Sequence, residues 1–169
     1  MKYKRILLTG VISLVTLLNS FLVLAVPDEI YLFRHSENLA GKNPDLSDAG
    51  KLRANHLVTL LKKYKKVHIY SSNYKRTLQS AKPLSEHFNE QISTYDAREL
   101  PAFKDELLKL NGVVIVIGHS NTTPRLAALL SNETITPMSE SEFSRYFLLS
   151  KSVNQNTNEY SVAEHKMNF

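Results

Sequence analysis

The sequence VVIVIG at residues 113–118 decides the fold class, because it is the strongest strand signal in the chain. Its first five residues are all β-branched, a side-chain type that favours strands. A strand with no polar residue on either face is buried on both faces, which is typical of a parallel sheet covered by helices on both sides. We therefore expect this strand to be central and parallel.

Strand-like and helix-like segments alternate around this stretch. Short apolar runs predict strands at residues 30–33, 67–70, 91–95, 145–149 and 160–165. Helical periodicity predicts a helix that begins after the N-cap residue Ser47, and further helices at residues 74–88, 101–110 and 122–130. Pro83 is expected to kink or split the second helix. This alternation predicts a three-layer α/β/α fold with a mostly parallel central sheet.

The first 25 residues have the pattern of an export signal. Lys2, Lys4 and Arg5 form a positive start, an apolar run follows, and Ala25 stands at the expected cleavage position. Cleavage after Ala25 would leave a periplasmic or secreted domain of residues 26–169. The apolar run is also long enough to span a bilayer, so an uncleaved anchor with an outward-facing domain is the alternative.

The composition argues against several classes of protein. The chain has 169 residues, no Cys and a formal net charge of +5, and three of its 21 Lys and Arg residues lie in the leader. The remaining domain is nearly balanced in charge, which does not favour a nucleic-acid binder. Without disulfides its stability must come from an apolar core, which a domain of this length can build. Nothing in the pattern indicates a particular oligomeric state.

Polar side chains follow three of the predicted strands at the point where each strand ends. Arg34 and His35 follow the first strand, Arg76 lies at the start of the helix after the second, and His119 follows VVIVIG. The carboxyl ends of parallel strands meet at one edge of a sheet, so these side chains should converge. Guanidinium groups and helix N-termini both bind phosphate oxygens. The sequence therefore predicts an anion site for a phosphoryl group.

The residue types also indicate a reaction. A neutral imidazole is a nucleophile that can form a covalent intermediate, and nearby guanidinium charge favours its neutral form. A leaving alkoxide then needs a proton from an Asp or a Glu. A metal site made of His35, His119 and a carboxylate is disfavoured, because the two arginines would repel a cation.

The segment GHSNT at residues 118–122 allows a rival interpretation, a hydrolase nucleophile elbow with Ser120 as the attacking group. That motif requires Gly where this chain has Thr122, and only His165 lies downstream to complete a triad. The domain is also too short for that fold, so we disfavour this interpretation.

Several blocks, in order, resemble the histidine phosphatase superfamily, which has the phosphoglycerate-mutase-like fold, and in particular its short exported bacterial members. The resemblance covers about residues 29–149. The blocks are FRHSE at 33–37, LSDAG at 46–50, YSSNYKRTLQSAKPL at 70–84, YDARELPAF at 95–103 and VIVIGHSNTTPRL at 114–126.

The resemblance implies that His35 is the phosphorylated nucleophile and that Arg34, Arg76 and His119 bind the phosphoryl group, with no metal and no cofactor. Ser36 replaces the small residue that usually follows the histidine, and would narrow the pocket slightly. Asn121 and the backbone of Ser120 would complete the rim.

The proton donor is less well defined by the resemblance. One large branch uses an Asp directly after the second histidine, where this chain has Ser120. Other members use a Glu that comes after the helix carrying the Arg-Thr pair and after the strand that follows this helix, and Glu99 occupies the comparable place. Glu37 and Glu106 are the alternatives.

The resemblance implies an exported, metal-independent phosphomonoesterase of the histidine acid phosphatase type. Its substrate would be a small-molecule or macromolecular phosphomonoester. The alternatives are a catalytically weak phosphate-binding or regulatory domain of the same fold, and a phosphomutase, for which the short loops offer little to build a cap. Phosphosugars, lipopolysaccharide phosphates, phosphoproteins and small esters all remain open as substrates.

Overall fold

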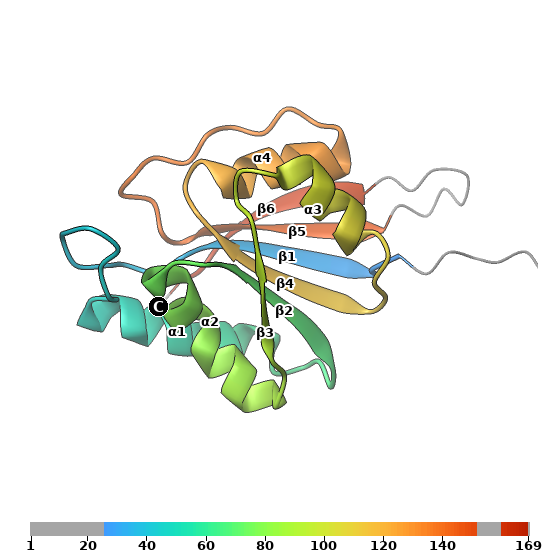
Figure 1. Cartoon of the computed structure of the whole chain (residues 1–169). Helices are drawn as coiled ribbons and strands as arrows, with labels where there is room; N and C mark the ends of the chain where they lie inside the picture. The colour runs from blue at the N-terminus through green and yellow to red at the C-terminus, as the bar shows by residue number, and fades with distance from the viewer. Residues whose placement is uncertain (1–25, 152–159, 169) are drawn as a thin grey trace, which may run out of the picture.

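A six-stranded sheet forms the centre of the molecule (Figure 1). The computed structural model describes residues 26–151 and 160–168. The predicted leader, residues 1–25, lies outside the described residues, so its cleavage or anchoring stays a prediction. In the described ranges, no helix has the length and apolar character needed to cross a membrane.

The strand order in the sheet is β3-β2-β4-β1-β5-β6. The strands are β1 (Glu29–Arg34), β2 (Val67–Ser72), β3 (Ile92–Tyr95), β4 (Val113–Gly118), β5 (Arg145–Lys151) and β6 (Tyr160–Lys166). As VVIVIG predicts, β4 lies inside the sheet and is parallel to both of its neighbours, β1 and β2. Only the β5 and β6 pairings are antiparallel, so the prediction of a mostly parallel sheet is confirmed.

Two pairs of helices cover the two faces of the sheet (Figure 1). One face carries α1 (Asp48–Leu61) and α2 (Lys75–Phe88), and the other carries α3 (Leu100–Leu107) and α4 (Thr122–Ser131). The β-branched residues of β4 serve both faces in turn. Ile115 and Ile117 pack in the core with α1 and α2, whereas Val114 and Val116 pack in the core with α3 and α4. The three-layer architecture is therefore confirmed.

Most element boundaries lie within two residues of the expected ones, but two expectations about the helices were wrong. Pro83 does not split α2, which runs unbroken from Lys75 to Phe88. α3 ends at Leu107 rather than at residue 110, because the chain turns there and passes through Gly112 at a φ of +71° before it enters β4.

The start of α1 is fastened to the segment that follows the first strand. Ser47 caps the helix, since its Oγ accepts a hydrogen bond from the backbone N–H of Gly50 at 3.1 Å. The backbone N–H of Ser47 donates to the carbonyl oxygen of Glu37 at 2.9 Å. A Cβ atom on Gly50 would lie only 1.9 Å from that oxygen. Gly50 therefore allows a close approach that fixes the backbone two residues after His35.

Candidate active site

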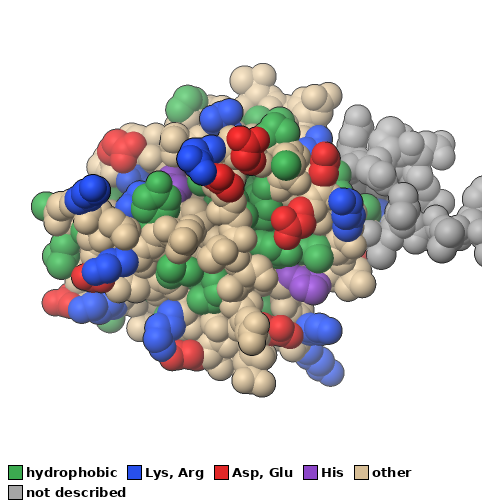
Figure 2. All heavy atoms as spheres, viewed as in Figure 1, with side chains coloured by type: hydrophobic (Ala, Val, Ile, Leu, Met, Phe, Trp, Pro, Cys, Tyr) green, Lys and Arg blue, Asp and Glu red, His purple; other side chains and the backbone are tan. Residues whose placement is uncertain are grey.

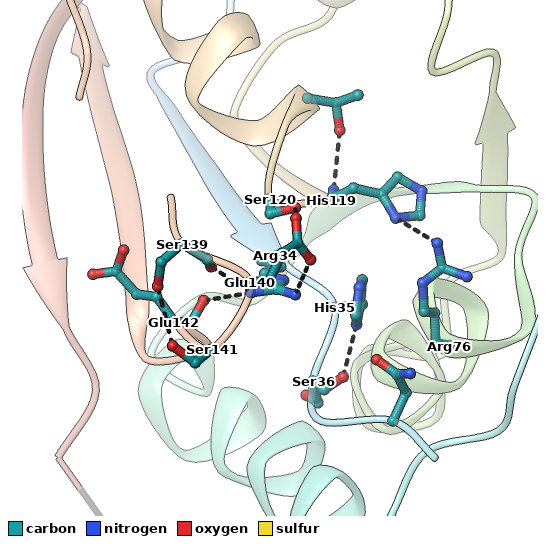
Figure 3. Close-up of polar contacts among 12 residues, drawn as sticks. Arg34, His35, Ser36, Arg76, His119, Ser120, Ser139, Glu140, Ser141 and Glu142 are labelled. Carbon is teal, nitrogen blue, oxygen red and sulfur yellow. Dashed lines mark hydrogen bonds and ion pairs between the residues drawn. The ribbon is translucent and has the colours of Figure 1, made fainter. Parts of the chain in front are cut away.

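The polar side chains at the strand ends converge on one cleft, as the sequence predicts (Figure 3). The ends of β1 and β4 are adjacent, and their register pairs Arg34 with Gly118. A cleft of about 650 Å³ opens at this edge. Its lining includes the six predicted residues Arg34, His35, Arg76, His119, Ser120 and Asn121.

His35 is held in the protonation state that a nucleophile needs. Its ring is buried, with 4% of the residue exposed, and its Nδ1 lies 2.8 Å from the carbonyl oxygen of Ser36. A carbonyl can only accept, so Nδ1 carries the hydrogen and the neutral ring has its lone pair on Nε2. Burial, aided by the charges of Arg34 and Arg76, lowers the pKa of His35 to about 4. The imidazole is therefore neutral near pH 7.

Ser36 is buried and does not line the cleft, although the resemblance implied that it would narrow the pocket. Its backbone N–H donates to Ser80 Oγ at 2.8 Å, and Ser80 in turn donates to the backbone carbonyl of Arg76. Ser36 therefore joins the strand end to α2 and helps to place His35 relative to Arg76.

A loop between α4 and β5 holds the guanidinium group of Arg34. Its Nη1 donates to the carbonyl oxygens of Ser139 at 2.9 Å and Glu142 at 3.0 Å, and its Nη2 donates to the Glu140 carboxylate at 3.2 Å. The guanidinium carbon also lies 4.0 Å from the centre of the Phe143 ring. Nothing in the sequence points to this loop, because it carries no motif and lies more than 100 residues from Arg34 along the chain.

Arg76 and His119 form a hydrogen-bonded pair on the opposite wall (Figure 3). Arg76 comes from the first turn of α2, and its Nη2 lies 3.1 Å from Nδ1 of His119. The other ring nitrogen of His119, Nε2, lies 2.8 Å from Ser72 Oγ. Burial, together with the charges of Arg76 and the other nearby basic groups, lowers the pKa of His119 to about 3.

The carboxylates favoured by the sequence lie outside the cleft. Glu99 is exposed at the N-cap of α3, and its neighbour Arg98 lines the cleft instead. Glu37 is bound by Arg53, with donor distances of 2.6 Å and 2.9 Å. Glu106 is an exposed residue of α3 and does not line the cleft.

Glu140 is the one Asp or Glu in the cleft lining within the described residues. Its Oε1 accepts from Ser120 Oγ at 2.7 Å and its Oε2 accepts from Arg34. Its side chain is 85% exposed, so solvent can reach it. No sequence signal identified Glu140, because it follows no strand and belongs to no motif.

Tyr74 also lines the cleft. Its ring meets the ring of His119 edge-on, with centroids 5.0 Å apart, and the guanidinium carbon of Arg76 lies 4.8 Å from its centre. A second hollow of about 520 Å³ shares Tyr74 and Arg98 with the cleft and extends along the ends of β2 and β3. This extension offers room for the part of a ligand that lies beyond the anion site.

Within residues 26–151 and 160–168, no group of three His, Cys, Asp or Glu side chains is placed to hold a metal ion. On the visible face of Figure 2, Lys and Arg are interspersed with Asp and Glu and form no continuous basic surface.

The fold is that of a phosphoglycerate-mutase-like α/β protein, and its cleft is lined by arginine and histidine side chains. The family model of the histidine phosphatase superfamily (branch 1) matches residues 30–103, a range that includes His35 and Arg76. Over these residues the chain is similar to the histidine phosphatase superfamily, and the solved structures that follow share its fold.

Solved structures support the assignment of the fold. A mycobacterial glucosyl-3-phosphoglycerate phosphatase is 13% identical, with a TM-score of 0.62 over 80% of this chain and 96% of its own. SixA from Agrobacterium tumefaciens is 19% identical, with a TM-score of 0.58 over 81% of this chain and 95% of its own. The protein histidine phosphatase SixA in complex with tungstate is 17% identical, with a TM-score of 0.59 over 82% of this chain and 96% of its own. No curated protein sequence matches the chain.

Proposed function

We propose that this protein is a metal-independent phosphomonoester hydrolase that forms a phosphohistidine on Nε2 of His35 and acts outside the cytoplasm after export. The observation that carries the proposal is the state of His35. Its Nδ1 is bound to the Ser36 carbonyl, which leaves the Nε2 lone pair available in a cleft lined by Arg34, Arg76 and His119.

The chemistry follows from this arrangement in two steps. Nε2 of His35 attacks phosphorus, the P–N bond forms and the bond to the leaving oxygen breaks, while Arg34 and Arg76 balance the charge on the phosphoryl oxygens. Water then attacks phosphorus, the P–N bond breaks and phosphate is released. The leaving oxygen gains one proton in the first step, and the attacking water loses one in the second.

We assign this proton transfer to Glu140 instead of Glu99. Glu140 lines the cleft beside Arg34, whereas Glu99 does not line it. The Glu140 carboxylate accepts a hydrogen bond from Arg34 Nη2 at 3.2 Å, so it lies beside the phosphoryl-binding guanidinium, where it can accept a proton from the attacking water. The same group, once protonated, can supply the proton to a leaving oxygen.

The substrate is proposed to be a phosphorylated small molecule or protein. Two kinds of structural neighbour support this breadth, since one is named for glucosyl-3-phosphoglycerate and the other is a protein histidine phosphatase. The hollow beyond Tyr74 and Arg98 leaves space for a leaving group larger than phosphate itself.

The decisive test is hydrolysis of an aryl phosphate by the purified protein, with the His35→Ala variant as control. Turnover by the wild type, none by the variant, and an acid-labile phosphoryl label on His35 are expected. Retained phosphate binding without any turnover would favour the alternative, a phosphate-binding or regulatory domain.

The acid–base assignment is tested with the pair Glu140→Gln and Glu99→Gln. Glu140→Gln should slow hydrolysis of alkyl phosphates more than that of aryl phosphates, because a poor leaving group depends more on protonation. Glu99→Gln should behave like the wild type on both. The opposite pattern would return the role to Glu99.

A further inference from the structure

A chain of hydrogen bonds runs beneath the cleft, from Arg76 through His119 to two hydroxyl side chains. Arg76 Nη2 lies 3.1 Å from His119 Nδ1, and His119 Nε2 lies 2.8 Å from Ser72 Oγ. Ser72 Oγ lies 3.0 Å from Thr77 Oγ1. Thr77 Oγ1 lies 2.7 Å from the backbone carbonyl oxygen of Ser72 and 2.9 Å from that of Tyr74.

The two ends of this chain determine the direction of every bond in it. A guanidinium group can only donate, so Nδ1 of His119 must accept from Arg76. A carbonyl oxygen can only accept, so the single hydroxyl hydrogen of Thr77 points to the backbone. Thr77 Oγ1 must then accept in its bond with Ser72, so Ser72 donates its hydroxyl hydrogen to Thr77. Ser72 Oγ must therefore accept from Nε2–H of His119.

Burial makes this order costly to break. Ser72, Thr77 and His119 are all buried. A buried polar group that loses its partner destabilises the protein, because no water molecule replaces the lost hydrogen bond. Turning the His119 ring proton to Nδ1 would set two donors against each other at Arg76. It would also leave Ser72 Oγ without its donor.

We propose that Ser72 is a positioning residue that keeps neutral His119 in its Nε2–H tautomer, so that Nδ1 accepts from Arg76 and holds that guanidinium group in the phosphoryl cleft. His119 then acts on the anion through Arg76, and the neutral ring presents an acceptor, not a donor, on the side that faces Arg76. The inference rests on the proposed function for its meaning in catalysis, but its direct readouts do not require turnover.

The first measurement is the tautomer of His119 in the full-length wild-type protein, by ¹⁵N NMR of histidine-labelled protein near pH 7. The expected result is a protonated Nε2 and an unprotonated Nδ1. A protonated Nδ1 would overturn the inference whatever any variant does.

Two variants then test the role of the hydroxyls. Ser72→Ala removes the acceptor, and Thr77→Val removes the group that orients Ser72 while keeping a similar shape. Either should let the Nδ1–H tautomer become populated and should weaken tungstate binding about tenfold, the loss expected for one buried hydrogen bond. Tungstate is used as the probe because it is a dianion that does not titrate near neutral pH.

Ser71→Ala is the matched control. Ser71 lies next to Ser72 in β2 and is equally buried, but its Oγ donates to a backbone carbonyl and does not touch His119. It should leave the His119 tautomer and tungstate affinity unchanged. Equal effects of Ser71→Ala and Ser72→Ala, or an unchanged tautomer in Ser72→Ala, would refute the positioning role. Absence of turnover in wild-type protein with these binding results intact would instead refute the hydrolase proposal.

Discussion

Gly50→Ala gives the most direct test of how the fold positions His35. The new Cβ would lie 1.9 Å from the carbonyl oxygen of Glu37, whereas carbon and oxygen normally stay about 3.3 Å apart. The backbone after His35 or the start of α1 must therefore move by more than about 1 Å. That movement stretches the hydrogen bond from the Ser47 N–H to the same carbonyl.

The expected cost combines opposing contributions. Overpacking of a tight site costs about 1–3 kcal/mol, and weakening the Ser47 hydrogen bonds adds about 1 kcal/mol. The better helix propensity of Ala returns about 1 kcal/mol. We expect a net loss of about 2 kcal/mol in the free energy of unfolding, or a fall in Tm of roughly 4–8 °C for a chain of this size. A misplacement of about 1 Å near His35 should also lower kcat/KM by more than tenfold.

The assay is urea and thermal denaturation, together with kcat/KM on an aryl phosphate. Thr59→Ala is the control, because Thr59 is exposed on the same helix and only its helix propensity should change. If Gly50→Ala were as stable and as active as Thr59→Ala, the close contact between Gly50 and Glu37 would not constrain the position of His35.

Three further predictions concern charge and packing. The folded pKa of His35, about 4, lies below its unfolded value of 6.5, so its neutral form stabilises the fold fully above pH 6.5 and this contribution is lost as the pH falls through about 4. Urea denaturation above pH 6.5 and below pH 4 should show a smaller fall in the free energy of unfolding for His35→Gln than for the wild type. An equal fall in the two proteins would contradict the lowered pKa of His35. Gly118→Ala would place Cβ 2.9 Å from Thr123 Oγ1, so tungstate affinity should fall; wild-type affinity contradicts this. Arg145→Met should destabilise the protein by about 2–4 kcal/mol, because it leaves the carboxylates and carbonyl oxygens that Arg145 binds without their partner. It should also lower kcat/KM, because these contacts hold the loop that binds Arg34. An unchanged unfolding curve would contradict this prediction.

Much of the fold was predictable because local pattern reports burial. The run of β-branched residues in β4 is buried on both faces, so the sequence reveals its central position without knowledge of its neighbours. Ser47 was recognised as an N-cap because its role depends only on the next three residues. The end of α3 was missed, since a turn before Gly112 competes there with helical periodicity.

The candidate site divides in the same way. Arg34, His35, Arg76 and His119 follow or closely follow strand ends, and the rule that parallel strands deliver their ends to one edge brings them together. The carboxylate was not predictable by that rule. Glu99 stands at the expected place in the chain, yet its backbone starts a helix at the rim and the side chain is exposed outside the cleft lining.

The amino-acid sequence alone therefore specified the class of fold and the four basic groups at the cleft, because both depend on periodicity and on strand ends. The partners of those groups depended on contacts through space. Arg34 is held by a loop that carries no periodic pattern, and the tautomer of His119 follows from which atoms face its two nitrogens. Such contacts join segments more than 40 residues apart, and only the packed chain brings their atoms within hydrogen-bonding distance.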